Sequence, residues 1–376
     1  MRSSRSALFL CVTAFCYQTA ILGQTWVKQT SGATYDLTDV LIIDSNTAWV
    51  VGGSGLKLKT TDGGSNWDFS RTSWSFRINA ISFGSSNNGW LVGDGGYGFS
   101  TTDGGSNWTR NDPSSKNLND IILVDANTGW IVGASGTILY TNDGGDSWTG
   151  QTSGTTNDLL GVHFVNSNTG WAVGGSGTIL KTTDGGSNWS SQTSGTTHTI
   201  HDVHFVDSNT GWAVKQSWST NNTILKTTDG GSTWSTQSSG TNKTQYGVHF
   251  IDSNSGWVVT NDGKILSTTD GGSNWSIDIS IPSENNLNDV HFIDSSTGWA
   301  VGDNGIIYKL TDTTAPTVTS VSSTADNGTY GIGSVIPITV TFDESVIVTG
   351  TPQLSLETGD TDVVVDYSSG SGSSIL

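Results

Sequence analysis

A sequence unit of about 40 residues recurs along most of the chain and constrains its fold more than any other feature. The sequence TDGGSNW, or a close variant, occurs six times and ends at Trp67, Trp108, Trp148, Trp189, Trp234 and Trp275. Successive copies lie 41, 40, 41, 45 and 41 residues apart. A second motif, typically SNTGW, ends at Trp49, Trp90, Trp130, Trp171, Trp212, Trp257 and Trp299. Self-similarity at a fixed period of this length indicates a repeat architecture.

Each repeat predicts four short β-strands. From Asp158 to Gln192 the sequence gives DLLGVHFV, GWAVG, TILKTT and WSSQ, separated by the turn sequences NSNT, GSG and DGGSN. Gly, Asn, Asp and Ser stand where tight turns need them. Four antiparallel strands per repeat of about 40 residues form one blade of a β-propeller.

The two ends of the repeat region complement each other. Trp26 and the following VKQTSG align with the sequence that closes the other blades, whereas the last repeat stops at Asp312 without its own GGxxW. An N-terminal strand that completes the last blade joins the ends of the array and removes its exposed edges. We therefore predict an all-β chain, with a seven-bladed β-propeller of four-stranded blades over residues 24–312. An open solenoid, the alternative, gives no reason for complementary ends.

The segments on either side of the propeller have different compositions. In residues 1–23, Arg2 and Arg5 precede an apolar stretch too short for a membrane anchor, which predicts a signal peptide cut after Gly23 or, alternatively, Ala20. We expect a secreted or cell-surface protein, with no membrane insertion of the mature chain. Residues 313–376 begin with a Thr-rich linker and continue in alternating β pattern, which predicts a partial β-sandwich and suggests a fragment of a longer protein.

Composition excludes several classes of function. Both cysteines, Cys11 and Cys16, lie in the predicted signal, so the mature chain should contain no disulfide and no cysteine-based site. Without Arg2 and Arg5, 13 of the 15 basic residues remain against 33 acidic ones, a formal charge of −20. Such a field disfavours nucleic acid and anionic membranes as partners. We expect a monomer that needs no cofactor and no metal.

The DGGSNW turns resemble the Asp-boxes, or BNR repeats, of sialidases and related propellers. The longer unit SNTGWAVG…GTILKTTDGGSNW is similar to the photosystem II assembly-factor propeller family, over roughly residues 24 to 312. The tail resembles the start of bacterial Ig-like or cadherin-like domains. The resemblance implies a β-propeller and, for photosynthetic members of the family, docking of a reaction-centre precursor through an arginine-bearing surface. Only Arg71, Arg77 and Arg110 follow the signal here.

The regular Asp-box residues have a structural explanation. Each aspartate can accept backbone N–H bonds across its turn, the glycines permit positive φ, and the tryptophan packs beneath the turn. We assign this role to Asp62, Asp103, Asp143, Asp184, Asp229 and Asp270, and to Trp67, Trp108, Trp148, Trp189, Trp234 and Trp275.

Two further series of polar residues recur before the second-motif tryptophans. Histidines stand eight residues before them in the last four blades, at His163, His204, His249 and His291. We interpret them as packing between blades, with metal ligation as the alternative, because Leu41, Ser82 and Ile122 occupy this position elsewhere. Aspartates stand ten residues before the tryptophans at Asp39, Asp120, Asp202 and Asp289. Turn capping explains them, and a carboxylate ring that attracts a cation is the alternative.

Residues that break the repeat are the candidates for function, because the fold does not require them. RTSWSFR replaces QTSGTT between the first two blades, and KQSWSTNN is inserted in the fifth. Both loops open on the same predicted face, the loop face, and Trp and Arg are frequent anchors of recognition. The predicted binding residues are Arg71, Trp74, Phe76, Arg77, Tyr97, Lys215, Trp218 and Tyr246; the alternative is that Trp74 and Trp218 merely cover blade edges.

The predicted function is therefore an exported, non-catalytic propeller that binds or scaffolds a protein or glycan ligand. One alternative is a photosystem II assembly-factor-like role in a photosynthetic host. The other is an Asp-box glycoside hydrolase or sialidase. A sialidase needs several converging arginines and a tyrosine–glutamate pair, but only Glu284 lies in the propeller. A glycosidase needs two carboxylates at a fixed separation, and the propeller aspartates all have turn roles available.

Overall fold

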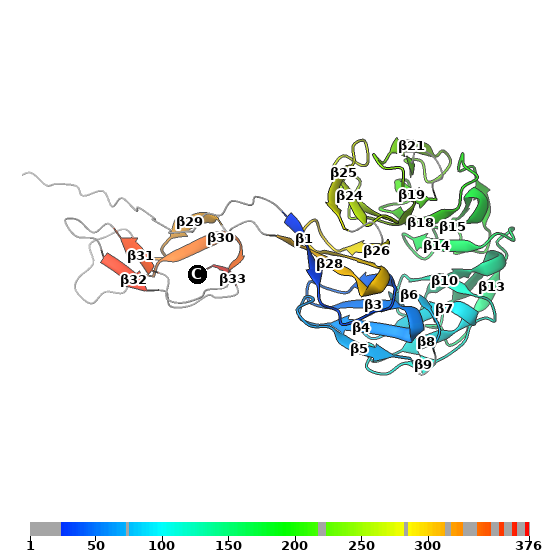
Figure 1. The fold of residues 1–376 in the computed structure, drawn as a ribbon, viewed down its shortest axis with the longest axis horizontal. Coiled ribbons are helices and arrows are strands. Elements are labelled where there is room, and N and C mark those ends of the chain that lie inside the picture. Colours follow the sequence, from blue (N-terminus) through cyan, green and yellow to red (C-terminus); the bar gives the residue numbers. More distant parts are fainter. Residues whose placement is uncertain are drawn as a thin grey trace, which may run out of the picture. The chain divides into compact units, whose positions relative to one another are not determined.

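The structure is a computed structural model, and it describes residues 24–72, 75–216, 223–281, 285–312, 317–325, 337–346, 353–356, 363–366 and 373–375. Residues Thr25–Thr311 form one compact unit, and Asp312–Leu376 belong to a second. The first unit is the predicted propeller: seven four-stranded antiparallel sheets arranged as blades in a ring (Figure 1).

Blades one to four follow chain order from the centre to the rim. Their strands are β2 (Leu37–Ile42), β3 (Ala48–Gly52), β4 (Leu56–Thr60), β5 (Asp68–Arg71); β6 (Ile78–Phe83), β7 (Gly89–Gly93), β8 (Gly98–Thr101), β9 (Thr109–Arg110); β10 (Leu118–Leu123), β11 (Gly129–Gly133), β12 (Thr137–Thr141), β13 (Thr149–Gln151); β14 (Leu159–Phe164), β15 (Gly170–Gly174), β16 (Thr178–Thr182), β17 (Ser190–Gln192).

Blades five and six follow the same order, and blade seven takes its outermost strand from the N-terminus, in the order β1-β28-β27-β26. The strands are β18 (Ile200–Phe205), β19 (Gly211–Lys215), β20 (Thr223–Thr227), β21 (Ser235–Ser238); β22 (Gln245–Phe250), β23 (Gly256–Thr260), β24 (Lys264–Thr268), β25 (Ser276–Ser280); β26 (Leu287–Phe292), β27 (Gly298–Gly302), β28 (Ile307–Asp312) and β1 (Gln24–Gln29).

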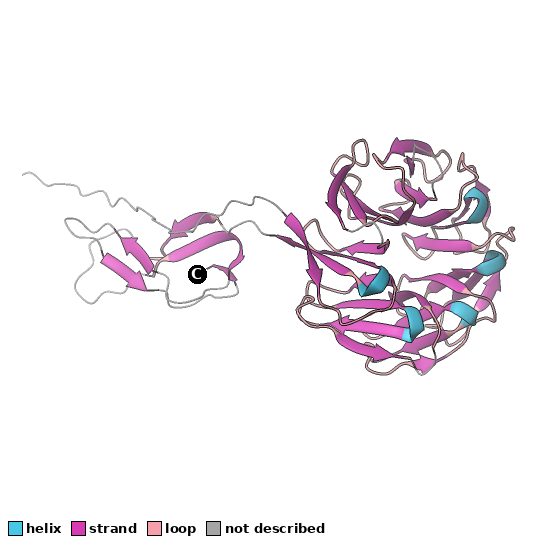
Figure 2. Cartoon of the chain, in the orientation of Figure 1, coloured by secondary structure: helices cyan, strands magenta, loops and turns pink. Residues whose placement is uncertain are grey.

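The helical content of the described residues is limited to short 3₁₀ turns between the second and third strands of five blades (Figure 2). These are η1 (Gly53–Gly55), η2 (Asp94–Gly96), η3 (Ala134–Gly136), η4 (Gly175–Gly177) and η5 (Asp303–Gly305). The ring is closed, because the inner strand of each blade contacts that of the next, including β26 against β2. The prediction of seven four-stranded blades closed by an N-terminal strand is confirmed.

The core lies between blades rather than within them. Each of the seven core clusters combines apolar side chains of two neighbouring blades. Where the inner strand of a blade ends in phenylalanine, the second-motif tryptophan of the preceding blade stacks on that ring, as Trp171 does on Phe205 with ring centroids 3.4 Å apart. The repeat therefore places its largest side chains where adjacent blades bury them.

The tail forms two small antiparallel sheets within its described residues. One contains β29 (Val318–Ser322), β30 (Thr339–Val346) and β33 (Ser373–Ile375), and the other contains β31 (Gln353–Leu356) and β32 (Val363–Asp366). The Ig-like assignment of this segment stays a prediction. The predicted signal peptide lies outside the described residues.

Candidate functional site

The DGGSNW-type turns, which resemble Asp-boxes and are called Asp-box turns below, bind their own backbone. In blade four, the Asp184 carboxylate accepts hydrogen bonds from the backbone N–H and side-chain amide of Asn188, at 2.9 and 2.7 Å. Thr182 Oγ1 donates to Asp184 Oδ1 and accepts the N–H of Gly186, both at 2.8 Å. Gly185 and Gly186 have φ of 69° and 84°, a region that disfavours other residues. The hydrogen bonds from Asn188 and Thr182 lower the pKa of Asp184.

These turns also connect neighbouring blades. The indole N–H of Trp130 donates to the carbonyl of Gly185, the Asp-box glycine of the following blade, at 3.2 Å. Trp90, Trp171 and Trp212 make the equivalent bond at 2.9–3.2 Å. The carboxylates and hydroxyls of these turns are used by the fold and leave little for a ligand to bind. Buried indole N–H groups without a hydrogen-bond partner remain at Trp67, Trp108, Trp148, Trp234 and Trp275.

The loops predicted to share one face are hydrogen-bonded to each other. The N–H of Gly55 in η1 donates to the carbonyl of Phe76, which lies in the loop that enters blade two, at 2.5 Å. The N–H of Thr72 donates to the carbonyl of Gly55 at 2.9 Å. The 3₁₀ turn of one blade and the loop that enters the next blade therefore belong to the same end of the propeller.

On this loop face, Arg71 stacks on two aromatic rings. Its guanidinium lies 4.5 Å from the ring centroid of Tyr35 and 5.3 Å from that of Phe69. Tyr35 and Phe69 are 39% and 48% exposed, so the stack is open to solvent. Stacking restricts the arginine side chain and so lowers the entropy that it loses when it binds a partner.

A second arginine in blade two has a similar environment. The Arg110 guanidinium lies 4.5 Å from the Tyr97 ring and forms an ion pair with Asp112 at 2.6 Å. Tyr97 also packs on Phe76, with ring centroids 5.0 Å apart. Phe76 therefore packs against the aromatic ring of the second stack, while its backbone carbonyl accepts the N–H of Gly55 in η1. We call Tyr35, Phe69, Arg71, Tyr97 and Arg110 the Arg–aromatic surface.

The other predicted binding residues have different positions. Phe76 is only 9% exposed and belongs to the core between blades one and two, whereas Arg77 is exposed. Lys215 is 7% exposed, and burial lowers its pKa. Tyr246 forms an edge-to-face pair with His201 at 5.1 Å, far from the Arg–aromatic surface in sequence. Trp74 and Trp218 lie outside the described residues.

Sequence reasoning missed Tyr35 and Phe69. The signal for Phe69 was present, because the outermost strands of blades two to five, β9, β13, β17 and β21, carry no aromatic residue. Tyr35 gave a weaker signal, because the loops that precede the inner strands vary between repeats. Their common contact with Arg71 becomes visible only in the structure.

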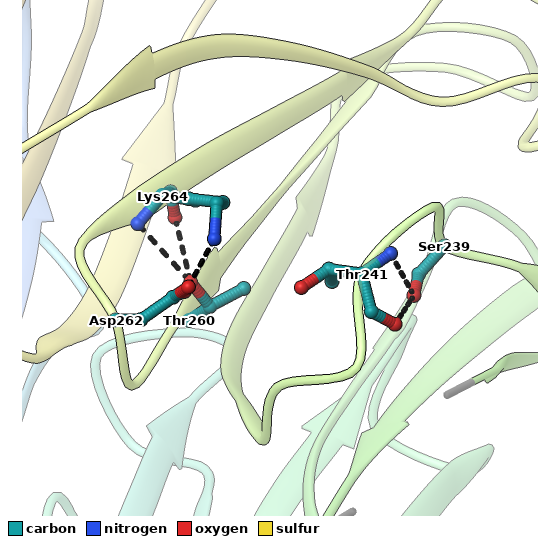
Figure 3. Close-up of polar contacts among 5 residues, drawn as sticks. All are labelled: Ser239, Thr241, Thr260, Asp262 and Lys264. Carbon is teal, nitrogen blue, oxygen red and sulfur yellow. Dashed lines mark hydrogen bonds and ion pairs between the residues drawn. The ribbon is translucent and has the colours of Figure 1, made fainter. Parts of the chain in front are cut away.

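Blade six departs from the repeat at the same end of the propeller. Instead of a 3₁₀ turn, it has a hairpin in which Lys264 forms an ion pair with Asp262 (Figure 3). Thr260 Oγ1 donates to Asp262 Oδ1 at 2.7 Å, and the Lys264 N–H donates to Thr260 Oγ1 at 3.1 Å. Asp262 is 8% exposed. These groups satisfy one another and stabilise the turn.

The four histidines form a ladder around the propeller axis. Ring centroids of His163, His204, His249 and His291 follow one another at 4.5 Å from blade to blade. Burial lowers the pKa of His163 and His291 to about 4. Across the described part of the chain, no group of three or more His, Cys, Asp or Glu side chains is arranged to hold a metal ion.

The sequence suggested that the four inner-strand aspartates cap turns, and this prediction is wrong. Each carboxylate accepts a backbone N–H from the inner strand of the following blade, as Asp120 Oδ2 does from Val162 at 2.7 Å. A β-bulge at the start of each of these inner strands shifts the register just before the aspartate. They are connectors between blades.

No helix of the described segments combines the length and apolarity needed to cross a membrane.

Comparison with known proteins places the chain among β-propellers. The sequence matches the family model described as photosynthesis system II assembly factor YCF48 over residues 19–116, 111–193 and 188–279. No curated protein sequence matches it significantly.

Several solved structures resemble this one. A structure described as YCF48 bound to D1 peptide has 22% identity and a TM-score of 0.65, over 80% of this chain and 97% of that chain. YCF48 from Cyanidioschyzon merolae has 22% identity and a TM-score of 0.66, over 76% and 99%. The Niastella koreensis GH74 enzyme has 16% identity and a TM-score of 0.61, over 93% of this chain and 61% of that chain.

At these identities the structural likeness establishes the fold alone, whereas the family match covers well over half of the sequence. This chain therefore belongs to the photosynthesis system II assembly factor YCF48 family.

Proposed function

We propose that this chain is a non-catalytic propeller that binds a polypeptide partner, as an assembly factor does, through its Arg–aromatic surface. Family membership favours this role over the more general cell-surface scaffold expected first from the sequence. A similar structure is described as bound to a D1 peptide, which supports a polypeptide as the ligand.

The observation that carries the proposal is the pair of stacked arginines. Arg71 and Arg110 are exposed, and each guanidinium lies against an aromatic ring at 4.5 Å. Exposed aromatic and arginine side chains are the residues most often found at binding hot spots. The Arg71 guanidinium, on a chain with 33 acidic and 15 basic residues, is a local positive feature that fits a carboxylate of the partner, whereas Arg110 already pairs with Asp112.

The test is direct binding of a fluorescently labelled D1-type peptide to the purified chain. Arg71→Ala should weaken binding about tenfold or more, because a stacked, pre-organised arginine is removed at little cost to the fold. Arg110→Ala should act in the same direction. Lys28→Ala is the matched control, since it removes an exposed positive charge from β1 on the rim.

The proposal is wrong if the peptide binds and both arginine variants bind it as tightly as the parent chain. Loss of binding in Lys28→Ala as well would indicate general electrostatic attraction. Binding of glycans, with none of peptides, would replace a polypeptide partner with a carbohydrate.

Two further parts of the proposal have separate tests. We propose export through residues 1–23, so protein recovered outside the cytoplasm should begin at Gln24. A recovered chain that retains Met1 contradicts this.

We also propose that the propeller has no glycosidase activity. Turnover of sialosides, β-glucans or xyloglucans that a single aspartate substitution abolishes would contradict it.

A further inference from the structure

Side-chain oxygens connect the 3₁₀ turns of the loop face to the blades that follow them. Among the described residues five blades have such a turn, and at three of them the residue directly before the next inner strand accepts the N–H of the middle residue of the turn. The Oδ1 atoms of Asp36, Asn117 and Asp158 accept the N–H of Asn304, Gly95 and Ser135, at 3.0, 2.7 and 2.7 Å.

The turn of blade four lacks this acceptor. Thr199 occupies the equivalent position directly before β18, and η4 contacts β18 as the other turns contact the strands that follow them. Ser176, the middle residue of η4, is exposed, and within the described part of the chain no side chain accepts its N–H. At the fifth turn, η1, the equivalent residue is Arg77, which cannot accept a hydrogen bond. The N–H of Ser176 is therefore available to a ligand.

A lysine lies beside the position of the missing acceptor. Lys215 ends β19, and its Cα pairs with that of Ile200, the residue after Thr199. The N–H of Gln216 donates to the carbonyl of Thr199 at 2.8 Å. Blade five therefore brings a positive charge to the place where three other junctions have an oxygen acceptor.

The repeat disfavours any side chain at the position of Lys215. Blades one to four and blade seven carry glycine there. A Cβ atom on one of these residues, Gly174, would lie 2.0 Å from the carbonyl oxygen of Asp158. Blade six carries Thr260, whose hydroxyl is hydrogen-bonded within its own hairpin. The lysine is thus a departure that the fold does not require.

The charge of Lys215 is also uncompensated. Its side chain is 7% exposed, and neither ion pair of the described residues involves it. Burial lowers its pKa. By contrast, Lys57 is 6% exposed, but its ammonium group lies 5.4 Å from the ring centroid of Trp108. A buried charge without a partner costs free energy that a bound anion offsets.

A surface hollow of about 700 Å³ lies at the same junction. Residues 192–198, which belong to the loop that enters blade five, line it. Ser194 of this loop donates to the carbonyl of Gly177 in η4 at 2.7 Å, and His198 directly precedes Thr199. The hollow therefore borders the turn that lacks its acceptor.

We propose that the junction of blades four and five binds a carboxylate through the ammonium group of Lys215 and the backbone N–H of Ser176. The carboxylate of the ligand takes the place that Asp158 fills one blade earlier, and its charge pairs with the lysine. It belongs either to a free organic acid or to a polypeptide, and the test distinguishes these sources. The site goes beyond the Arg–aromatic surface, which lies on blades one and two.

The melting temperature of the full chain, measured in sodium acetate and in sodium chloride at equal ionic strength, tests the site. A ligand that binds only the folded chain raises this temperature, so acetate should produce a saturable rise in the parent chain. Lys215→Met should weaken the apparent affinity for acetate about tenfold or more, because it removes a charge-assisted contact. Lys57→Met is the matched control. It removes an equally buried lysine and should leave the response to acetate unchanged.

Thr199→Asp is a second variant, and it keeps Lys215. Its carboxylate should occupy the site from within the chain, so the melting temperature should rise without any ligand and the saturable response to acetate should disappear. In a chain that also carries Lys215→Met, Thr199→Asp should no longer raise the melting temperature, because the positive charge is gone.

N-acetyl-trialanine with a free C-terminal carboxylate, and the same peptide as its amide, distinguish the sources of the carboxylate. A response to acetate shows that a free acid is sufficient, whereas a response to the free-carboxylate peptide alone assigns the site to a polypeptide. The proposal is overturned if neither compound stabilises the parent chain, or if the amide acts as strongly as the acid. It is equally overturned if folded Lys215→Met and Thr199→Asp variants respond as the parent chain does. Arg71→Ala should keep the response, so this result is separate from binding at the Arg–aromatic surface.

Discussion

A threonine at the end of the third strand organises each Asp-box turn at the scale of single residues. Thr182 is 2% exposed, and its hydroxyl donates to Asp184 while it accepts the N–H of Gly186. The same residue type with the same bonds recurs at Thr60, Thr101, Thr141, Thr227 and Thr268. The hydroxyl is therefore as much a part of the motif as the aspartate that names it.

Thr182→Val should destabilise the propeller by about 1–3 kcal/mol, because valine has the same shape but leaves the buried N–H of Gly186 without an acceptor. Urea unfolding of the full chain measures the change. Thr149→Val on the exposed face of β13 is the control and should stay within about 0.5 kcal/mol of the parent chain. Equal stability of the two variants would show that the threonine bonds contribute nothing net.

Sequence alone identified residues of the turns better than residues of the surface. Asp62 and its equivalents, with the glycines that follow, have local roles, so the spacing within one turn is enough to assign them. The sequence predicted Arg71 as a binding residue but not its two aromatic neighbours. Tyr35 and Phe69 lie 36 and 2 residues before Arg71, and the fold brings both into contact with it.

At the scale of secondary-structure elements, β1 decides whether the ring is closed. It supplies the outermost strand of blade seven next to β28, although the two strands lie at opposite ends of the propeller sequence. Trp26 is 7% exposed and packs edge-to-face on Phe292 at 5.7 Å, while the adjacent Val27 is 41% exposed. One side chain of β1 therefore faces the core and the next faces solvent, as a strand at the rim requires.

Trp26→Ala should lower the stability of the propeller by about 3–5 kcal/mol, the usual cost of removing a buried tryptophan. Val27→Ala, one residue further on, should change it by less than about 0.5 kcal/mol. Thermal and urea unfolding of both variants measure the difference. If Trp26→Ala unfolds like the parent chain, β1 does not hold blade seven in solution.

The repeat sequence predicted these elements well because every strand is bounded by turn residues that act locally. Where the repeat breaks, prediction was weaker. Blade six replaces its 3₁₀ turn with the hairpin of Thr260, Asp262 and Lys264, and no other blade shows this ion pair among the described residues. The tail contains no sequence repeat, so its strands could be predicted only from the alternation of apolar and polar residues.

The whole molecule is asymmetric about its axis although its backbone repeats. Blades four to seven carry the histidine ladder, and blades one to three carry Leu41, Ser82 and Ile122 at the same position. Burial raises the pKa of Asp39 and Asp202 well above the usual range, and it raises the pKa of Asp120 to about 7. The pKa values of the histidines and of these aspartates thus shift in opposite directions, because burial disfavours the charged form of each group.

Acid should destabilise the propeller through the histidines. Burial lowers the pKa of His163 to about 4, so the unfolded chain binds more protons than the folded one between about pH 6.5 and 4. Stability is lost as the pH falls through this window, and a complete shift of this size corresponds to about 3 kcal/mol. His163→Leu should make the melting temperature fall less steeply as the pH is lowered, because leucine binds no proton. The fold should accept this leucine, since Leu41 already occupies the same position in blade one.

The control for this prediction is His198→Leu, which removes a histidine from the loop between β17 and β18 and keeps the ladder intact. Its melting temperature should decline with acid as steeply as that of the parent chain. If His163→Leu declines just as steeply, the imidazoles are hydrated enough to accept protons without penalty. In that case His163→Leu would remove only packing between blades four and five. Its melting temperature would then be lower than that of the parent chain by a similar amount at every pH.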